Sequence, residues 1–176
     1  MIAANQAPGR MRTLQAQQWE NLIAKKCWQD AREEADDLVE GQIKVDIQGY
    51  DLDGEAISYA RENARFAGVD SLIHFQQRPV SELNHSKKYG FLIGNPPYGE
   101  RLESQSDLRA LYREIGHAYE RLDSWSMYLI TAYEQAERAI GKKADKNRKI
   151  YNGMMKTYFY QYFGSAPRGR AASVKE

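Results

Sequence analysis

Residues 89–99, Tyr-Gly-Phe-Leu-Ile-Gly-Asn-Pro-Pro-Tyr-Gly, join a short apolar run to a loop that contains two consecutive prolines. The run predicts a buried strand, and the prolines end it because they lack a backbone donor. Residues 43–53 have a similar organisation, with alternating apolar residues followed by Asp51 and Asp53. Each stretch precedes apolar residues at helical spacing. The sequence therefore predicts an α/β fold with parallel strands and helical crossovers.

The remaining elements follow from the same two periodicities. We expect helices over residues 14–40, 53–68, 108–122 and 132–140, and strands over residues 43–50, 72–75, 89–93 and 127–130. Asp53 is expected to cap the second helix, and residues 150–163 to form paired terminal strands. In such sheets ligands bind outside the carboxyl ends of the strands, where residues 50–53 and 95–98 fall.

Length and composition exclude several classes of protein. A chain of 176 residues with 42% hydrophobic and 28% charged residues is one core-forming domain, or part of one. No apolar run approaches the roughly 18 residues that a membrane span needs, and residues 1–6 do not resemble a signal peptide. The single cysteine, Cys27, is expected to pack on its helix. No metal-ligand spacing is present, and a reducing cytoplasm is the expected compartment.

Charge is distributed unevenly along the chain. Residues 142–176 contain nine Lys and Arg but only two acidic residues, a net charge of +7, while residues 1–141 carry −6. Such asymmetry is typical of a chain that binds a polyanion through its basic end. A solvated basic tail without a partner explains the charge equally well.

The Asn-Pro-Pro-Tyr loop has the groups needed to hold an exocyclic amine. The Asn95 side-chain oxygen and the Pro96 carbonyl can accept both protons of such an amine, and Pro97 stiffens the loop. Tyr98 offers a face on which a base taken out of its stack can lie. The alternative is a rigid turn in which Tyr98 packs as a lid.

The wider context resembles a known family. Residues 93–102, Ile-Gly-Asn-Pro-Pro-Tyr-Gly-Glu-Arg-Leu, resemble the amine-methylation motif of S-adenosylmethionine-dependent nucleic-acid methyltransferases. The chain resembles more narrowly the bacterial 23S ribosomal RNA guanine-N2 methyltransferase family, whose members are often labelled N6-adenine-specific DNA methylases. Other matching blocks, in the same order, are Ala7–Arg10, Gly49–Asp53, Ala60–Ala64 and Lys146–Gly153.

This resemblance implies a class I, Rossmann-like methyltransferase sheet and a role for each motif. Asn95, Pro96, Pro97 and Tyr98 would form the catalytic motif, with Asn95 also beside the cofactor. Asp51 would hold the ribose of S-adenosylmethionine, although a capping role is the alternative. Four basic residues would contact RNA phosphates: Arg101, Lys146, Arg148 and Lys149. For the last three, the alternative is a hairpin that keeps an edge strand soluble.

The chain departs from the family pattern at three places. Residues 1–176 would be a partial catalytic domain, without the family's RNA-capturing THUMP domain and without its first strand and glycine-rich loop. That strand lies in the family between the two strands that here end near Asp51 and Asn95. These neighbours would pair differently, a second copy or complementing chain would fill the gap, or the chain would be poorly stable. Near Pro79 the family's adenine-binding acid is missing, and Glu82 is the nearest substitute.

The expected function is methyl transfer from S-adenosylmethionine to an exocyclic base amine, with guanine N2 of 23S ribosomal RNA as the target. One alternative is N6-adenine methylation of DNA, because the same motif can serve that amine. A second alternative is a catalytically inactive fragment that binds RNA through its basic end. No membrane partner is expected.

Overall fold

The structure is a computed structural model that describes residues 1–9, 12–41, 43–97 and 105–167. The chain divides into two compact units, residues 1–77 and 78–176, which are described separately. In the described parts, no helix is both long and apolar enough to cross a membrane. Four short 3₁₀ helices accompany the main elements: η1 (Ile2–Ala4), η2 (Gln15–Gln18), η3 (Asp70–Leu72) and η4 (Val80–Glu82).

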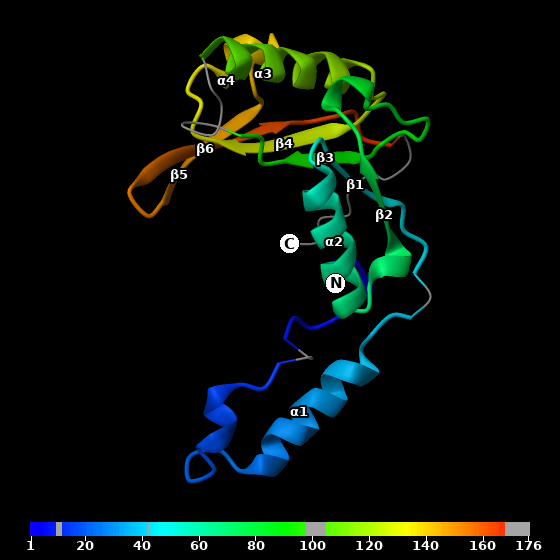
Figure 1. The fold of residues 1–176 in the computed structure, drawn as a ribbon, viewed down its shortest axis with the longest axis vertical. Helices are drawn as coiled ribbons and strands as arrows, with labels where there is room; N and C mark the ends of the chain where they lie inside the picture. Colours follow the sequence, from blue (N-terminus) through cyan, green and yellow to red (C-terminus); the bar gives the residue numbers. More distant parts are fainter. Residues whose placement is uncertain (10–11, 42, 98–104, 168–176) are drawn as a thin grey trace, which may run out of the picture. The chain divides into compact units, whose positions relative to one another are not determined.

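The first unit contains a β-α-β crossover. Strands β1 (Ile47–Asp51) and β2 (Ile73–Gln77) pair in parallel, and helix α2 (Gly54–Phe66) connects them (Figure 1). Asp53 caps α2 as predicted, because its carboxylate accepts the Glu55 backbone N–H at 2.8 Å. β1 begins four residues later than the alternating pattern predicts, and each of its five residues pairs with a residue of β2.

The long helix expected over residues 14–40 is wrong. Instead η2 is followed by turns, and helix α1 covers only Lys25–Asp37. Leu22, in those turns, is 72% exposed, and Ile23 is also exposed. Most helical stability comes from packing an apolar face, so these residues gain nothing from being helical. Cys27 on α1 is exposed as well, which corrects the packing role expected for it.

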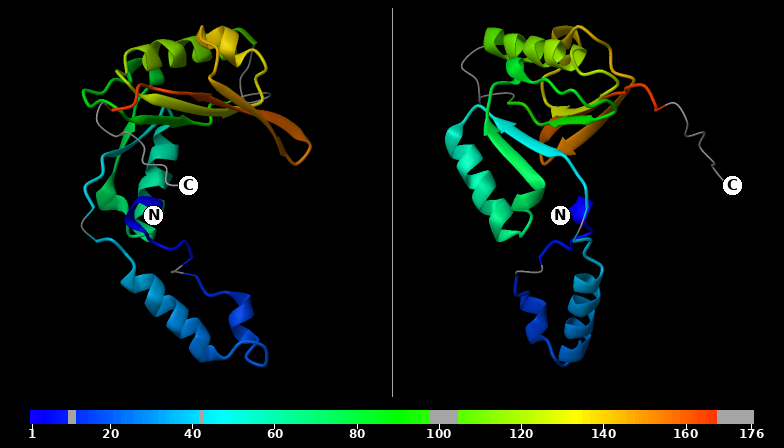
Figure 2. Two further views of the ribbon diagram at one scale, coloured as in Figure 1. Left: turned by 180° about the vertical axis from the view of Figure 1, so that it is seen from behind. Right: turned by 90° about the vertical axis from the view of Figure 1, so that its right-hand side faces the viewer.

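The second unit is a four-stranded sheet with helices on one face. Its strands lie in the order β3 (Phe91–Gly94), β4 (Ser126–Thr131), β6 (Met155–Tyr162) and β5 (Lys146–Asn152). β3 and β4 are parallel, whereas β6 runs antiparallel to both β4 and β5. Helices α3 (Gln105–Glu120) and α4 (Ala136–Ile140) lie together over this sheet (Figure 2).

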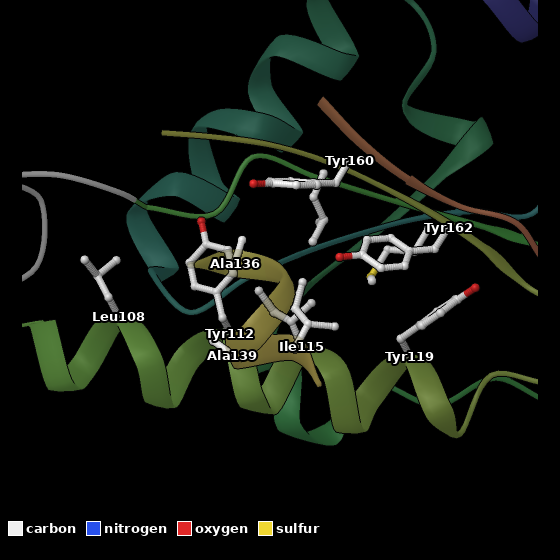
Figure 3. Packing of buried hydrophobic residues seen from close by; sticks show 11 residues of the cluster. Leu108, Tyr112, Ile115, Tyr119, Ala136, Ala139, Tyr160 and Tyr162 are labelled. Atoms are coloured by element: carbon white, nitrogen blue, oxygen red, sulfur yellow. The ribbon is translucent and has the colours of Figure 1, made fainter. Parts of the chain in front are cut away.

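Aromatic and aliphatic side chains fill the space between α3 and the sheet. Tyr112 and Ile115 of α3 face Tyr160 and Tyr162 of β6 (Figure 3), and all four are buried. The Tyr112 hydroxyl also hydrogen-bonds the buried Thr131 hydroxyl at the end of β4. The amphipathic pattern of residues 108–122 correctly predicts this packing face.

The opposite face of the same sheet is more exposed than the sequence predicts. β3 was expected to be buried, but Phe91 is 66% exposed and Ile93 is 77% exposed. Both alternate with half-buried residues, because strand side chains point to opposite faces and the helices cover only one. Tyr128, half-buried on this face, stacks on Phe159 with ring centroids 6.1 Å apart.

The sheets of the two units are separate. Among the described strands β1 pairs only with β2, and β3 pairs only with β4. Each of them therefore has one edge without a strand partner in the described parts of the chain.

A buried hydroxyl in this core gives a stability prediction. The Tyr162 hydroxyl is buried with no hydrogen-bond partner among the described residues, and burial raises its pKa above the ordinary value of about 10. A raised folded-state pKa means that stability is lost as pH rises above the unfolded value, because the unfolded chain releases the proton first. Tyr162→Phe should therefore stabilise the protein by about 1–2 kcal/mol at pH 7, and by more above pH 10.

Urea unfolding at pH 7 and at pH 10.5 measures this difference. The neighbouring Tyr160 is also buried, and burial raises its pKa to about 12, so some alkaline destabilisation persists in the variant. A Tyr162→Phe variant less stable than the wild type at both pH values would contradict the prediction.

Candidate functional site

Asp51 lies at the carboxyl end of β1 with its side chain exposed. Its Oδ1 accepts the Asp53 backbone N–H at 2.9 Å. Asp53 in turn caps α2. The two acids thus have different roles: Asp53 holds the helix, and Asp51 keeps an accessible carboxylate at the strand end.

Gln77 supports the turn that follows Asp51, a role that sequence reasoning missed. It pairs with Asp51 across the parallel strands, and its side-chain amide donates to the Leu52 carbonyl at 3.0 Å. The same side chain lies against Gly54, where a Cβ would meet its amide oxygen at 3.0 Å.

Asn95, Pro96 and Pro97 follow β3 directly, at the carboxyl end of that strand. Asn95 is exposed, while both prolines are half-buried. Gly94, just before them, packs against β4, because a Cβ there would lie 3.1 Å from the Leu129 side chain. The strand therefore holds the start of the motif close to the sheet and leaves the Asn95 amide accessible. Tyr98 and Arg101 fall outside the described residues.

An ion pair lies near the carboxyl ends of β3 and β4 in the second unit. Glu134, three residues after the end of β4, receives hydrogen bonds from the Lys156 ammonium at 2.7 Å and from the Tyr158 hydroxyl at 3.3 Å. Lys156 lowers the pKa of Glu134, and Glu134 raises the pKa of Lys156. Residue spacing does not reveal this cluster, because Glu134 is more than 20 residues from Lys156 and Tyr158 and meets them only through the pairing of β4 with β6.

The three basic residues expected to contact RNA lie on β5 and are exposed. Strand alternation separates them: Lys146 and Arg148 share one face, and Lys149 points to the other. The Lys146 ammonium lies 5.8 Å from the ring centroid of Phe163. β5 and β6 are the paired terminal strands that the sequence predicts, and their register does not bring all three charges together on one face.

Glu82, the expected substitute for an adenine-binding acid, already has a partner. The Arg78 Nε lies 3.3 Å from its carboxylate, in an ion pair between residues four positions apart. In the described residues, no three His, Cys, Asp or Glu side chains gather as a metal site.

Two relatives are similar over nearly the whole chain. The Putative RNA methyltransferase YpsC of Bacillus subtilis is 40% identical over 163 residues, which cover 93% of this chain and 42% of the relative. The Ribosomal RNA large subunit methyltransferase K/L of Legionella pneumophila (strain Corby) is 34% identical over 161 residues, covering 91% of this chain and 23% of the relative.

Two solved structures share both fold and sequence. SMU.472, a putative methyltransferase complexed with SAH, has a TM-score of 0.89 and 36% identity, covering 96% of this chain and 44% of its own. A predicted N6-adenine-specific DNA methylase from Listeria monocytogenes has a TM-score of 0.85 and 43% identity, covering 93% and 42%. The α/β fold expected from the sequence is thus confirmed as that of these methyltransferase structures.

The chain spans less than half the length of each of these proteins. The match to a family is nonetheless extensive, because residues 1–161 fit the family described as RMKL-like, methyltransferase domain. The strand-end positions of Asp51 and Asn95 lie within that range. This chain belongs to the RMKL-like methyltransferase domain family.

Proposed function

We propose that the chain is an S-adenosylmethionine-dependent methyltransferase domain that acts on an exocyclic base amine, guanine N2 of 23S ribosomal RNA, in the cytoplasm. The observation that carries this proposal is the exposed Asn95 at the carboxyl end of β3, followed by two half-buried prolines. Family membership and the relatives named for RNA methylation support it.

The described residues fit the cofactor at Asp51. Its exposed carboxylate stands at the end of a parallel strand, with Oδ1 oriented by the Asp53 N–H, and a carboxylate so placed can accept hydrogen bonds from ribose hydroxyls. S-adenosylmethionine, when bound, supplies a methyl group carried on a positively charged sulfur. The protein's contribution is to position the acceptor amine and to shape the electrostatics around it.

Asn95 and Pro96 would orient that amine. The Asn95 Oδ1 and the Pro96 carbonyl would each accept one of its N–H groups, which draws electron density toward the nitrogen. The fixed φ angles of Pro96 and Pro97 reduce the freedom of this loop before any substrate arrives. Tyr98 would stack on the base, and Asn95 would also contact the cofactor.

The basic residues would bind the RNA backbone. Lys146 and Arg148, on one face of β5, would contact one run of phosphates, and Lys149, on the other face, a second. Arg101, which follows the Asn-Pro-Pro-Tyr motif, would bind a phosphate near the target base.

Calorimetric titration of S-adenosylmethionine into the chain tests the cofactor site. Asp51→Asn removes the charge but keeps an acceptor for the Asp53 N–H, so the dissociation constant should rise about 10–100-fold with the fold intact. Asp53→Asn is the matched control, because asparagine caps a helix as well as aspartate does. Equal affinity in Asp51→Asn and wild type would contradict the role of Asp51.

Two alternative functions are also supported by specific observations. N6-adenine methylation of DNA is favoured by the similarity to the Listeria protein described as an N6-adenine-specific DNA methylase. A catalytically inactive chain that binds RNA is favoured by the exposed charges of β5. Methylation of an RNA but not of an adenine-containing DNA duplex excludes the first, and any transfer to RNA excludes the second.

The strand edges support a further proposal about assembly. The edges of β1 and β3 that lack a partner among the described strands would pair with a strand of a second copy or of a complementing chain. The exposed Phe91 and Ile93 beside the β3 edge would be covered in that assembly. Light scattering over a range of concentrations should show a mass above that of one chain; a monomer at every concentration would contradict self-association.

A further inference from the structure

The hairpin formed by β5 and β6 extends beyond the rest of its sheet. β6 pairs with β4 only as far as Tyr158, opposite Thr131. The pairs nearer the turn, from Ile150 with Thr157 to Asn152 with Met155, connect β5 and β6 alone. The hairpin is drawn in orange in Figure 1, where it projects past the ends of the other strands.

The tip of this hairpin is apolar and exposed. Its turn consists of Gly153, at φ +60°, and Met154, whose side chain is fully exposed at 101%. A glycine with positive φ at the first position is typical of a tight hairpin turn, so Met154 is held at the extreme end of a regular element. Tyr151 and Met155 beside it are also exposed. The strand register places Tyr151 and Met155 on opposite faces of the hairpin, so Met154 is flanked by one exposed apolar side chain on each face. Exposed apolar side chains gathered at one end of an element are typical of a surface that contacts another molecule.

The tip projects from the same end of the sheet as Asn95, where β3 and β4 have their carboxyl ends. β3 and β4 are parallel, and Gly94 pairs with Leu129, so Asn95 follows β3 near the carboxyl end of β4. β6 runs antiparallel to β4, so its turn end lies at that same edge. Only β4 separates β6 from β3, which corresponds to about 10 Å across the sheet at ordinary strand spacing. Asn95 is level with Phe159 of β6, and Met154 lies about 16 Å farther along the hairpin.

Charge on the stem of the hairpin indicates what the tip contacts. Arg148 and Lys149 are exposed on β5, while Lys156 on β6 already pairs with Glu134 at 2.7 Å. Arg148 and Lys149 place exposed cations on both faces of the stem, although Lys149 also interacts electrostatically with Glu134. Such a stem below an exposed apolar tip suits a ligand with negative charge outside and apolar surface inside. A nucleic acid has this construction, with phosphates outside and stacked bases inside.

We propose that Met154 is a wedge that enters the RNA beside the target base and occupies the space that this base leaves in the stack. The proposal rests on the proposed function, because a methyltransferase must take its base out of the stack to reach the amine. Apolar side chains inserted between bases offset part of the unstacking cost in other nucleic-acid complexes. The stem holds the phosphates, and the tip meets the bases.

The test uses the fluorescence of 2-aminopurine, which rises when that base is unstacked. The RNA is the large-subunit ribosomal fragment that the wild-type chain binds best in a tiled set, with 2-aminopurine at successive purine positions. Wild-type chain should raise the fluorescence at one position. Met154→Ser should lose this rise while its dissociation constant changes by less than about threefold, because phosphate contacts dominate affinity.

Two control variants separate the wedge from other effects. Leu22→Ser removes another exposed apolar side chain, in the first unit, and should leave fluorescence and affinity unchanged. Arg148→Gln should weaken binding and lower the salt-dependence slope by about 1, because it removes one phosphate contact. Circular dichroism melts confirm that each variant folds.

The outcomes distinguish the wedge from the function on which it rests. An undiminished fluorescence rise with Met154→Ser overturns the wedge and leaves the methyltransferase proposal standing. In a second outcome, Met154→Ser keeps the fluorescence rise but loses self-association or binding to lipid vesicles. That result assigns the tip to a protein or membrane contact and also overturns the wedge. Failure of the wild-type chain to bind any ribosomal fragment contradicts both proposals.

Discussion

Asn95→Ala should abolish methyl transfer while leaving the fold and RNA affinity intact. The Asn95 side chain is exposed at the end of β3, so its removal leaves no cavity and should not change the melting temperature. Without its oxygen, one N–H of the amine loses its acceptor and the nitrogen is no longer oriented. Loss of one such positioning group costs about 100-fold or more in turnover. Single-turnover transfer of a labelled methyl group to ribosomal RNA measures the effect.

Two companion variants sharpen this test. Asn84→Ala makes the same change at another exposed asparagine and should keep full activity. Asn95→Asp retains an acceptor oxygen and should keep part of the activity that alanine removes. Undiminished turnover in Asn95→Ala would refute the proposed role of this residue.

Gly116→Ala should have the largest effect on stability. Gly116 lies on α3, where an added Cβ would be 2.3 Å from the backbone oxygen of Ile140 at the end of α4. Because the obstacle is backbone rather than a flexible side chain, the two helices must separate to admit the methyl group. Overpacking of this kind costs about 3 kcal/mol, and the melting temperature should fall by about 10 °C or more.

Gly41→Ala provides the matched control. It is the same substitution at a glycine with nothing within 4 Å of the added Cβ and without a positive φ, so stability should stay within about 0.5 kcal/mol of wild type. Thermal melts followed by circular dichroism compare the two variants. Equal melting temperatures would mean that α3 and α4 are not in close contact at Gly116.

Residue spacing predicts two kinds of feature correctly: those that depend on neighbouring residues, and helices whose apolar face packs on a core. The cap at Asp53 and the buried stripe of α3 both follow from residue spacing, because each depends on neighbours within a few positions. The paired terminal strands were also predicted, although β5 begins at Lys146 rather than after the basic residues.

The errors share a physical cause: exposure depends on tertiary partners that residue spacing does not reveal. An apolar run such as residues 89–93 indicates a strand, but whether Phe91 and Ile93 are covered depends on what packs on that face. Likewise, Leu22 and Ile23 fit a helical stripe and yet lie in turns, because nothing in the described structure buries them. The basic residues of β5 needed the strand register before Lys149 could be assigned to a separate face.

Analysis of the methylated nucleoside tests the central claim most directly. Ribosomal RNA is incubated with the chain and labelled S-adenosylmethionine, digested to nucleosides, and separated by chromatography with mass detection. The account predicts labelled N2-methylguanosine with the wild-type chain and none with Asn95→Ala. Label in N6-methyladenosine instead, or no label in RNA at all, would contradict it.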